Sequence, residues 1–93
     1  MERSLNEILD RAKKANRIVI VGAGVRGKEL LTHFEKAAVS VDAFFDNNET
    51  ITGMYINGIK ITKPYKMEGG KVLYVVAVDS VEARKKLRSQ LRS

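Results

Sequence analysis

Apolar residues recur along this chain first with a helical period and then in an extended run. The segment Ser4-Leu-Asn-Glu7 has the capping-box pattern of a helix start, and apolar residues then follow at i, i+3, i+4 and i+7. This pattern predicts an amphipathic helix over residues 4–15. The β-branched run that follows lacks polar alternation, as in a strand covered on both faces, and predicts a strand over residues 17–21.

The same alternation of helix and strand continues after a glycine-rich break. Helical spacing of leucine, phenylalanine and alanine predicts a second helix that ends near Ala38. Apolar runs predict strands over 39–45 and 71–78, and a final apolar stripe predicts a helix over 79–91. Asn57-Gly58 lies between two short extended runs and predicts a hairpin, while Pro64 and Gly70 bound at most one helical turn.

This order of elements predicts a single α/β domain over residues 1–93. We expect a small, Rossmann-like three-layer fold with a mainly parallel sheet of 3–4 strands, plus the short hairpin. Right-handed crossovers would place the strands 39–45 and 71–78 on opposite sides of the strand 17–21. The βαβ core, residues 17–46, then has its topological switch point after residue 21, and ligands bind such sheets at that point.

The glycine-rich break has the spacing Gly22-x-Gly24-x-x-Gly27, directly after a predicted strand and at the start of a predicted helix. In this context the first glycine permits a tight turn, the second lets a phosphate approach the backbone, and the third lets helix and strand pack closely. The helix N-terminus favours an anion. We therefore predict that the loop binds a ligand phosphate through these residues: Gly22, Ala23, Gly24, Val25, Arg26 and Gly27.

Asp46 closes the second predicted strand of this unit, near the spacing at which an acid accepts hydrogen bonds from ribose hydroxyls. With Asn47 beside it, Asp46 is a candidate nucleoside contact, and its charge disfavours a 2′-phosphate. The alternative is that Asp46-Asn47-Asn48 only turns the chain.

Four residues at this edge of the predicted sheet have two interpretations each. Arg26 and Lys28 are either counter-charges for a phosphate or side chains lying in solvent. Asp79 and Ser80 are interpreted in the first place as the N-cap of the last helix, and the alternative is that they contact the ligand.

The sequence lacks the residues that several classes of enzyme need for catalysis. The segment from Gly22 also imitates a P-loop, but Glu29 stands where a hydroxyl must hold magnesium. His33, the one histidine, falls on the polar side of its helix, and no Tyr-x-x-x-Lys pair, paired carboxylates or His/Cys metal set occurs. The sequence thus predicts a binding module, and whether the chain acts as an enzyme stays open.

Composition and charge argue against nucleic acid and membranes as binding partners. The chain has 93 residues, no cysteine and a net charge of +6, and bases and acids balance over residues 1–59, so residues 60–93 carry the whole excess. Aromatic residues are 6%, and no recognised motif accompanies the charge, which argues against nucleic acid. No apolar run approaches the roughly 20 residues that span a bilayer. We expect a cytoplasmic location and no membrane partner.

The glycine loop, the strand ending Val41-Asp-Ala-Phe-Phe-Asp46-Asn47-Asn48 and the segment Gly53–Ile61 appear in an order that resembles a known class of domain. The chain is similar, over roughly residues 17–91, to the N-terminal Rossmann-like modules of bacterial surface-polysaccharide enzymes, including sialic-acid and bacillosamine-type sugar acetyltransferases. The resemblance implies a nucleotide-sugar holder, with the loop near phosphate and Asp46 near the nucleoside. The left-handed β-helix that carries acetyl transfer in those enzymes has no counterpart here.

Three functions remain as alternatives. The first is a nucleotide or nucleotide-sugar binding module of a polysaccharide biosynthesis enzyme, with a UDP-type ligand. The second is an NAD-binding fragment of an oxidoreductase, which would need its other half, the remainder of a longer enzyme or a homo-oligomer, to complete a site. The third is a non-catalytic interaction module whose glycines serve packing alone.

Overall fold

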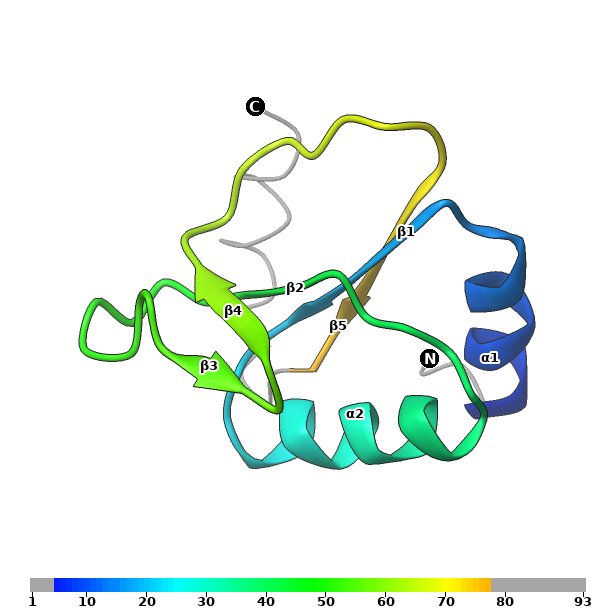
Figure 1. The fold of residues 1–93 in the computed structure, drawn as a ribbon, viewed down its shortest axis with the longest axis horizontal. Helices are drawn as coiled ribbons and strands as arrows, with labels where there is room; N and C mark the ends of the chain where they lie inside the picture. Colours follow the sequence, from blue (N-terminus) through cyan, green and yellow to red (C-terminus); the bar gives the residue numbers. More distant parts are fainter. Residues whose placement is uncertain (1–4, 78–93) are drawn as a thin grey trace.

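A computed structural model describes residues 5–77, which form two helices and one five-stranded sheet (Figure 1). The predicted helix 79–91, the candidate residues Asp79 and Ser80, and the Ser4 cap lie outside the described residues. The elements are α1 (Leu5–Lys14), β1 (Arg17–Val21), α2 (Val25–Lys36), β2 (Ala43–Phe45), β3 (Tyr55–Ile56), β4 (Ile59–Thr62) and β5 (Val72–Val76).

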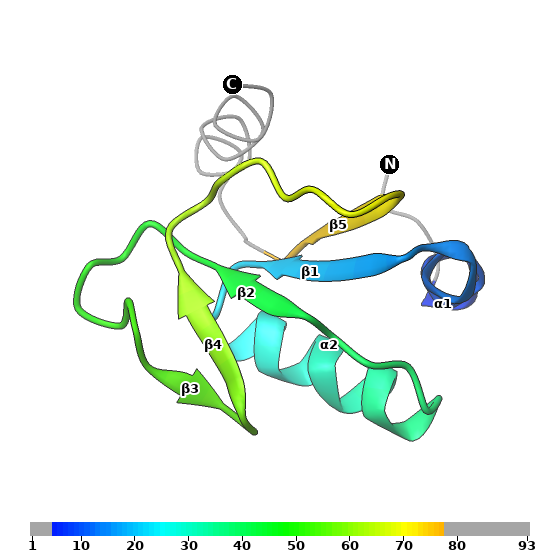
Figure 2. The same ribbon diagram turned by 45° about the horizontal axis from the view of Figure 1, so that its top comes forward.

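The strand order is β3-β4-β2-β1-β5, so that β1 is flanked by β2 and β5 (Figure 2). β1 pairs in parallel with both β2 and β5, and β2 pairs in parallel with β4. The prediction that β2 and β5 flank β1 is confirmed, as is the α/β class with a mostly parallel sheet. The third layer depends on residues 79–91 and stays a prediction.

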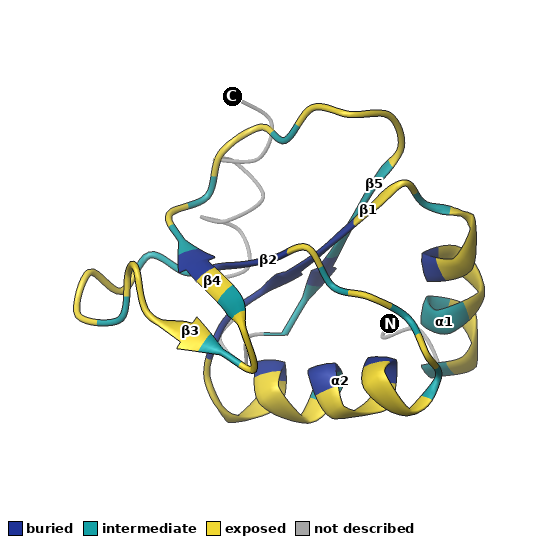
Figure 3. Cartoon of the chain, viewed as in Figure 1, coloured by how far each residue is buried: buried dark blue, intermediate teal, exposed yellow. Residues whose placement is uncertain are grey.

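Both helices pack on one face of the sheet, where they cover its larger apolar core. Every third or fourth residue of α2 turns toward the sheet, and Figure 3 shows this inner stripe as buried against an exposed outer side. Leu31 and Phe34 of α2 are fully buried there, together with Ala12 of α1. The strands contribute Ile18, Ile20, Phe44, Ile61 and Val75.

The opposite face of the sheet has its own buried cluster, formed by Val19, Val21, Ala43 and Phe45. The connection from β4 to β5 runs over this face as an irregular segment, and Met67 packs on the cluster. The Met67 amide donates a hydrogen bond of 3.2 Å to the hydroxyl of Tyr74. No helical turn forms between Pro64 and Gly70, where the sequence allowed for at most one.

The predicted hairpin forms at Asn57-Gly58, and both residues have positive φ (49° and 81°), as a two-residue primed turn requires. The sequence predicts a mainly parallel sheet of 3–4 strands plus this hairpin, whereas the sheet in the structure has five strands. The structure corrects that interpretation, because β4 pairs with β2 through Phe44 with Ile61 and Phe45 with Thr62. The hairpin therefore extends the sheet and brings the end of β4 beside the end of β2.

The strand predicted over 39–45 is also shorter than expected, since β2 begins only at Ala43. Asp42 explains the difference. Its carboxylate accepts a hydrogen bond from the Ile18 amide at 2.7 Å, while its own amide donates to the Ile18 carbonyl at 2.8 Å. The Asp42 side chain thus occupies the Ile18 amide, to which a longer β2 would have bonded through its backbone. Residues 39–42 therefore form a connection and not a strand.

Candidate functional site

The glycine loop leaves the carboxyl end of β1 by a tight turn that two of its glycines make possible. Gly22 has φ +113° and donates a hydrogen bond to the Phe45 carbonyl at 2.7 Å. Gly27 is buried in the first turn of α2, where a Cβ atom would overlap the carbonyl oxygen of Gly22. Backbone conformation and close helix–strand contact therefore account for Gly22 and Gly27 without any ligand.

Gly24 lies between these two and differs from both. It is the N-cap of α2, with φ −84° and ψ −158°, a conformation open to ordinary L-residues. A Cβ atom there would meet nothing within 4 Å, and the residue is exposed. Neither packing nor conformation requires a glycine at this position, so its bare backbone faces open space.

The first turn of α2 carries no acidic residue of its own. The helix has no side-chain cap, and its first α-helical hydrogen bond runs from the Lys28 amide to the Gly24 carbonyl at 3.0 Å. The amides of the first turn precede that bond and carry the positive end of the helix dipole. Arg26 and Lys28, both exposed, add further positive charge where a helix ordinarily carries acids. The arrangement suits an anion from outside.

Asp46 is tied directly to the glycine loop. One carboxylate oxygen accepts a hydrogen bond from the Ala23 amide at 2.9 Å, and the other accepts from the Asn48 amide at 2.9 Å. The second bond is an Asx-type turn, so Asp46 turns the chain at this point. A carboxylate has about four acceptor positions, so this one can still accept hydroxyl donors. The ribose contact stays a prediction.

Because Asp46 bridges two segments, its replacement is expected to affect folding before it affects any ligand. Asp46→Ala leaves the Ala23 and Asn48 amides without their acceptor and should lower the free energy of unfolding by about 1–3 kcal/mol. Asp46→Asn retains one acceptor oxygen, so its free energy of unfolding should fall by roughly half as much as that of Asp46→Ala. Urea denaturation of both variants measures this. Equal stability of Asp46→Ala and the wild type would show that the bridge carries no weight.

Two other residues of the predicted site, Asn47 and Val25, lie beside this turn and the glycine loop. Asn47 is half-buried, and Val25 is 73% exposed in the first turn of α2. Beyond Asp46, the Lys63 ammonium donates a 3.0 Å hydrogen bond to Glu49 and holds the pKa of that exposed carboxyl below its ordinary value. The Glu49 carboxylate is therefore ionised and paired with a base, so the pair adds little net charge.

Two residues at the same end of the sheet were not singled out from the sequence. The Tyr65 ring is 49% exposed and lies 5.0 Å, centre to centre, from the Phe45 ring. Thr62 ends β4, its carbonyl accepts the Asp46 amide at 2.9 Å, and its hydroxyl is buried without a hydrogen-bond partner. The pairing of β4 with β2 brings them here, and the local hairpin signal carries no information about that pairing.

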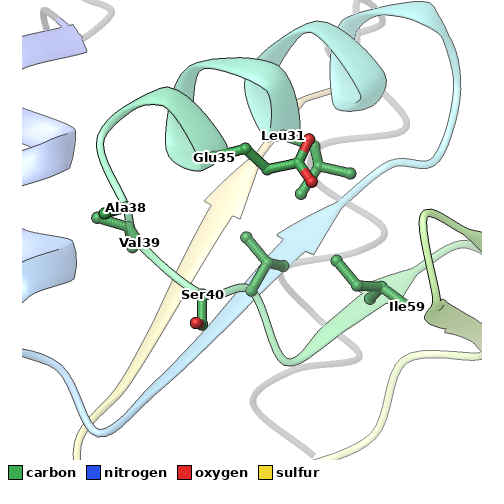
Figure 4. A pocket seen from close by; sticks show the side chains of 7 residues that line it. Leu31, Glu35, Ala38, Val39, Ser40 and Ile59 are labelled. Carbon is green, nitrogen blue, oxygen red and sulfur yellow. The ribbon is translucent and has the colours of Figure 1, made fainter.

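A shallow groove is present at the opposite end of α2 (Figure 4). Its lining is mainly apolar, and the carboxylate of Glu35 accepts a 3.3 Å hydrogen bond from the Asn57 amide group nearby. Leu31 is the first residue of α2 in its lining and lies six residues past Val25, so about 9 Å of helix separates this groove from the glycine loop. The groove is therefore distinct from the loop. Its lining residues are Leu31, Glu35, Ala38, Val39, Ser40, Val41 and Ile59.

The part of the chain that the structure describes shows few other candidates for chemistry. His33 is exposed on the outer side of α2, where the sequence placed it. Within residues 5–77, no three acidic, histidine or cysteine side chains gather as a metal site would require. None of the helices there is long and apolar enough to cross a bilayer.

No family model matches this chain, and no curated protein and no solved structure is significantly similar to it.

Proposed function

We propose that this chain is a nucleotide-binding module of Rossmann-like type, and that its glycine loop holds the phosphates of a nucleotide or nucleotide sugar. The observation that carries the proposal is the contrast among the three glycines. Gly22 and Gly27 are explained by the turn and by packing, whereas Gly24 faces open space in an ordinary conformation. A ligand that must approach the backbone closely supplies the missing reason for a glycine there.

The electrostatics of the loop support a phosphate as the group that approaches. Amides of the first helical turn offer hydrogen-bond donors, and Arg26 and Lys28 offer counter-charge from the same turn. Asp46 stands at the end of the neighbouring strand, where a nucleoside attached to that phosphate would present its ribose. Its negative charge favours an unmodified ribose over a 2′-phosphorylated one.

The size of the unit favours one class of ligand. The described sheet supplies one nucleotide-sized half of a dinucleotide fold, which suits a UDP-type nucleotide sugar better than a whole NAD. We place the module in surface-polysaccharide biosynthesis on the resemblance of its motifs alone. An NAD-binding fragment of an oxidoreductase uses the same phosphate contacts and is separated from the first proposal by the ligand titration.

Isothermal titration calorimetry tests the proposal with UDP-N-acetylglucosamine, UDP, NAD and inorganic phosphate as separate ligands. We expect UDP compounds to bind more tightly than NAD, and Arg26→Gln to weaken that binding about tenfold, since a charge-assisted contact contributes about 1.5 kcal/mol or more. Lys36→Gln is the matched control, because it removes an exposed base from the far end of the same helix. Absence of binding by all four ligands at millimolar concentration would overturn the proposal.

A further inference from the structure

The two margins of the sheet differ in how they are protected. β3 forms one margin and has two residues, and β5 forms the other with five (Figure 2). Edge strands are usually short, charged, broken by proline or bulged, because an open edge pairs with other chains. β5 reads Val-Leu-Tyr-Val-Val and has none of these features. Within the described residues it has a partner strand on one side only.

The register of β5 against β1 shows which backbone groups face outward. The amide of Ala77 donates to the Val21 carbonyl at 2.7 Å, and the Lys71 carbonyl accepts from the Arg17 amide at 3.1 Å. Because the direction of these groups alternates along a strand, the odd-numbered residues of β5 bond to β1. The amides and carbonyls of Val72, Tyr74 and Val76 therefore point away from the sheet.

From these observations we infer that β5 is a homodimer interface, at which the β5 strands of two copies pair antiparallel about a two-fold axis at Tyr74. In that register Val72 faces Val76 of the other copy, and Leu73 faces Val75. The outward residues form hydrogen-bonded pairs that exchange both N–H···O bonds. Such an interface does not depend on the proposed nucleotide site.

The sequence of β5 makes a second copy the best fit for this edge. Read from either end, the strand has a β-branched residue at each terminus, a branched aliphatic residue next, and an aromatic residue at the centre. An isologous interface needs such self-complementarity, since each residue must suit its symmetry mate. The charged neighbour, Lys71, falls opposite Ala77 of the other copy, so pairing brings no like charges together across the strand ends.

Sedimentation equilibrium tests the interface. Two paired strands of five residues make a small contact, and small interfaces are weak, so the protein concentration should run from about 10 μM to 1 mM. We expect a monomer–dimer equilibrium in the wild type. Val72→Pro removes an outward amide at the first residue of the strand without breaking the β1–β5 ladder, and should weaken dimerisation at least tenfold. Tyr55→Pro is the matched control on the β3 margin, where the hairpin register also points the amide outward, and should leave dimerisation unchanged.

Amide hydrogen exchange keeps the test decisive should a proline variant fail to fold. In the wild type, the amides of Val72, Tyr74 and Val76 should become protected as protein concentration rises, whereas those of Leu73, Val75 and Ala77 should be protected throughout. A monomer at 1 mM would overturn the inference. So would a dimer that a folded Val72→Pro variant retains, or a dimer in which the outward amides of β5 exchange freely.

Discussion

Replacement of Gly27 by alanine is expected to lower the free energy of unfolding by about 3 kcal/mol or more. The added Cβ would overlap the Gly22 carbonyl oxygen, and the Phe44 ring lies 3.5 Å from the same position. The closest neighbour is backbone, which cannot rotate away, so α2 must shift off β1. For a domain of this size the melting temperature should fall by roughly 12 °C or more.

Thermal and urea denaturation followed by circular dichroism measure this loss. Gly24→Ala is the control, because it adds the same methyl group three residues earlier in open space. A Gly27→Ala variant as stable as the wild type would show that α2 does not pack closely on the turn.

The same Gly24→Ala variant carries the second large effect, which is on binding. Its stability should stay within about 1 kcal/mol of the wild type, since the loss of a glycine N-cap is offset by lower entropy of the unfolded chain. Nucleotide affinity should fall at least tenfold, because the methyl group occupies the space through which a phosphate reaches the backbone amides.

Calorimetric titration of Gly24→Ala alongside its denaturation curve separates the two properties. Undiminished nucleotide binding by this variant would show that Gly24 does not serve the approach of a phosphate. Asp46 variants are less informative on this point. Asp46 also bridges Ala23 and Asn48, so a loss of binding there mixes a ligand effect with a structural one.

Strong local patterns predicted the parts of the fold that depend on them. The β-branched run predicted the bounds of β1, Arg17–Val21, and the glycine spacing placed the start of α2. The order β2-β1-β5 followed from the handedness of crossover connections. Each of these features depends on neighbouring residues or on a general rule of chain topology.

Features that depend on contacts between distant segments were not predictable in the same way. The residues of β4 and β2 carry no sequence pattern that predicts their pairing. That pairing nevertheless brings Thr62 and Tyr65 toward the candidate site. The early residues of the predicted strand 39–45 have suitable propensity. Asp42 nevertheless uses its side chain to satisfy Ile18 and delays the start of β2 to Ala43.

At the candidate site, the sequence spacing brought the glycines and Asp46 into one prediction but did not separate their structural roles. The spacing assigned Asp46 one of two tasks, a nucleoside contact or a turn. The structure shows the turn and adds a bond to Ala23 that closes the loop against β2. It also shows that Gly24, unlike Gly22 and Gly27, has neither a positive φ nor a neighbour within 4 Å of an added Cβ, a difference that the glycine spacing alone does not predict.

Binding of a nucleotide phosphate at the glycine loop is the central claim. ¹H–¹⁵N correlation spectra of the labelled protein, titrated with UDP, test it most directly because they report each backbone amide. We predict that the largest shifts fall on Gly24, Val25 and Arg26, with smaller ones at Asp46, and that Gly24→Ala abolishes them at the same UDP concentration. Unchanged loop amides at saturating UDP, or shifts confined to the groove at the far end of α2, would contradict this claim.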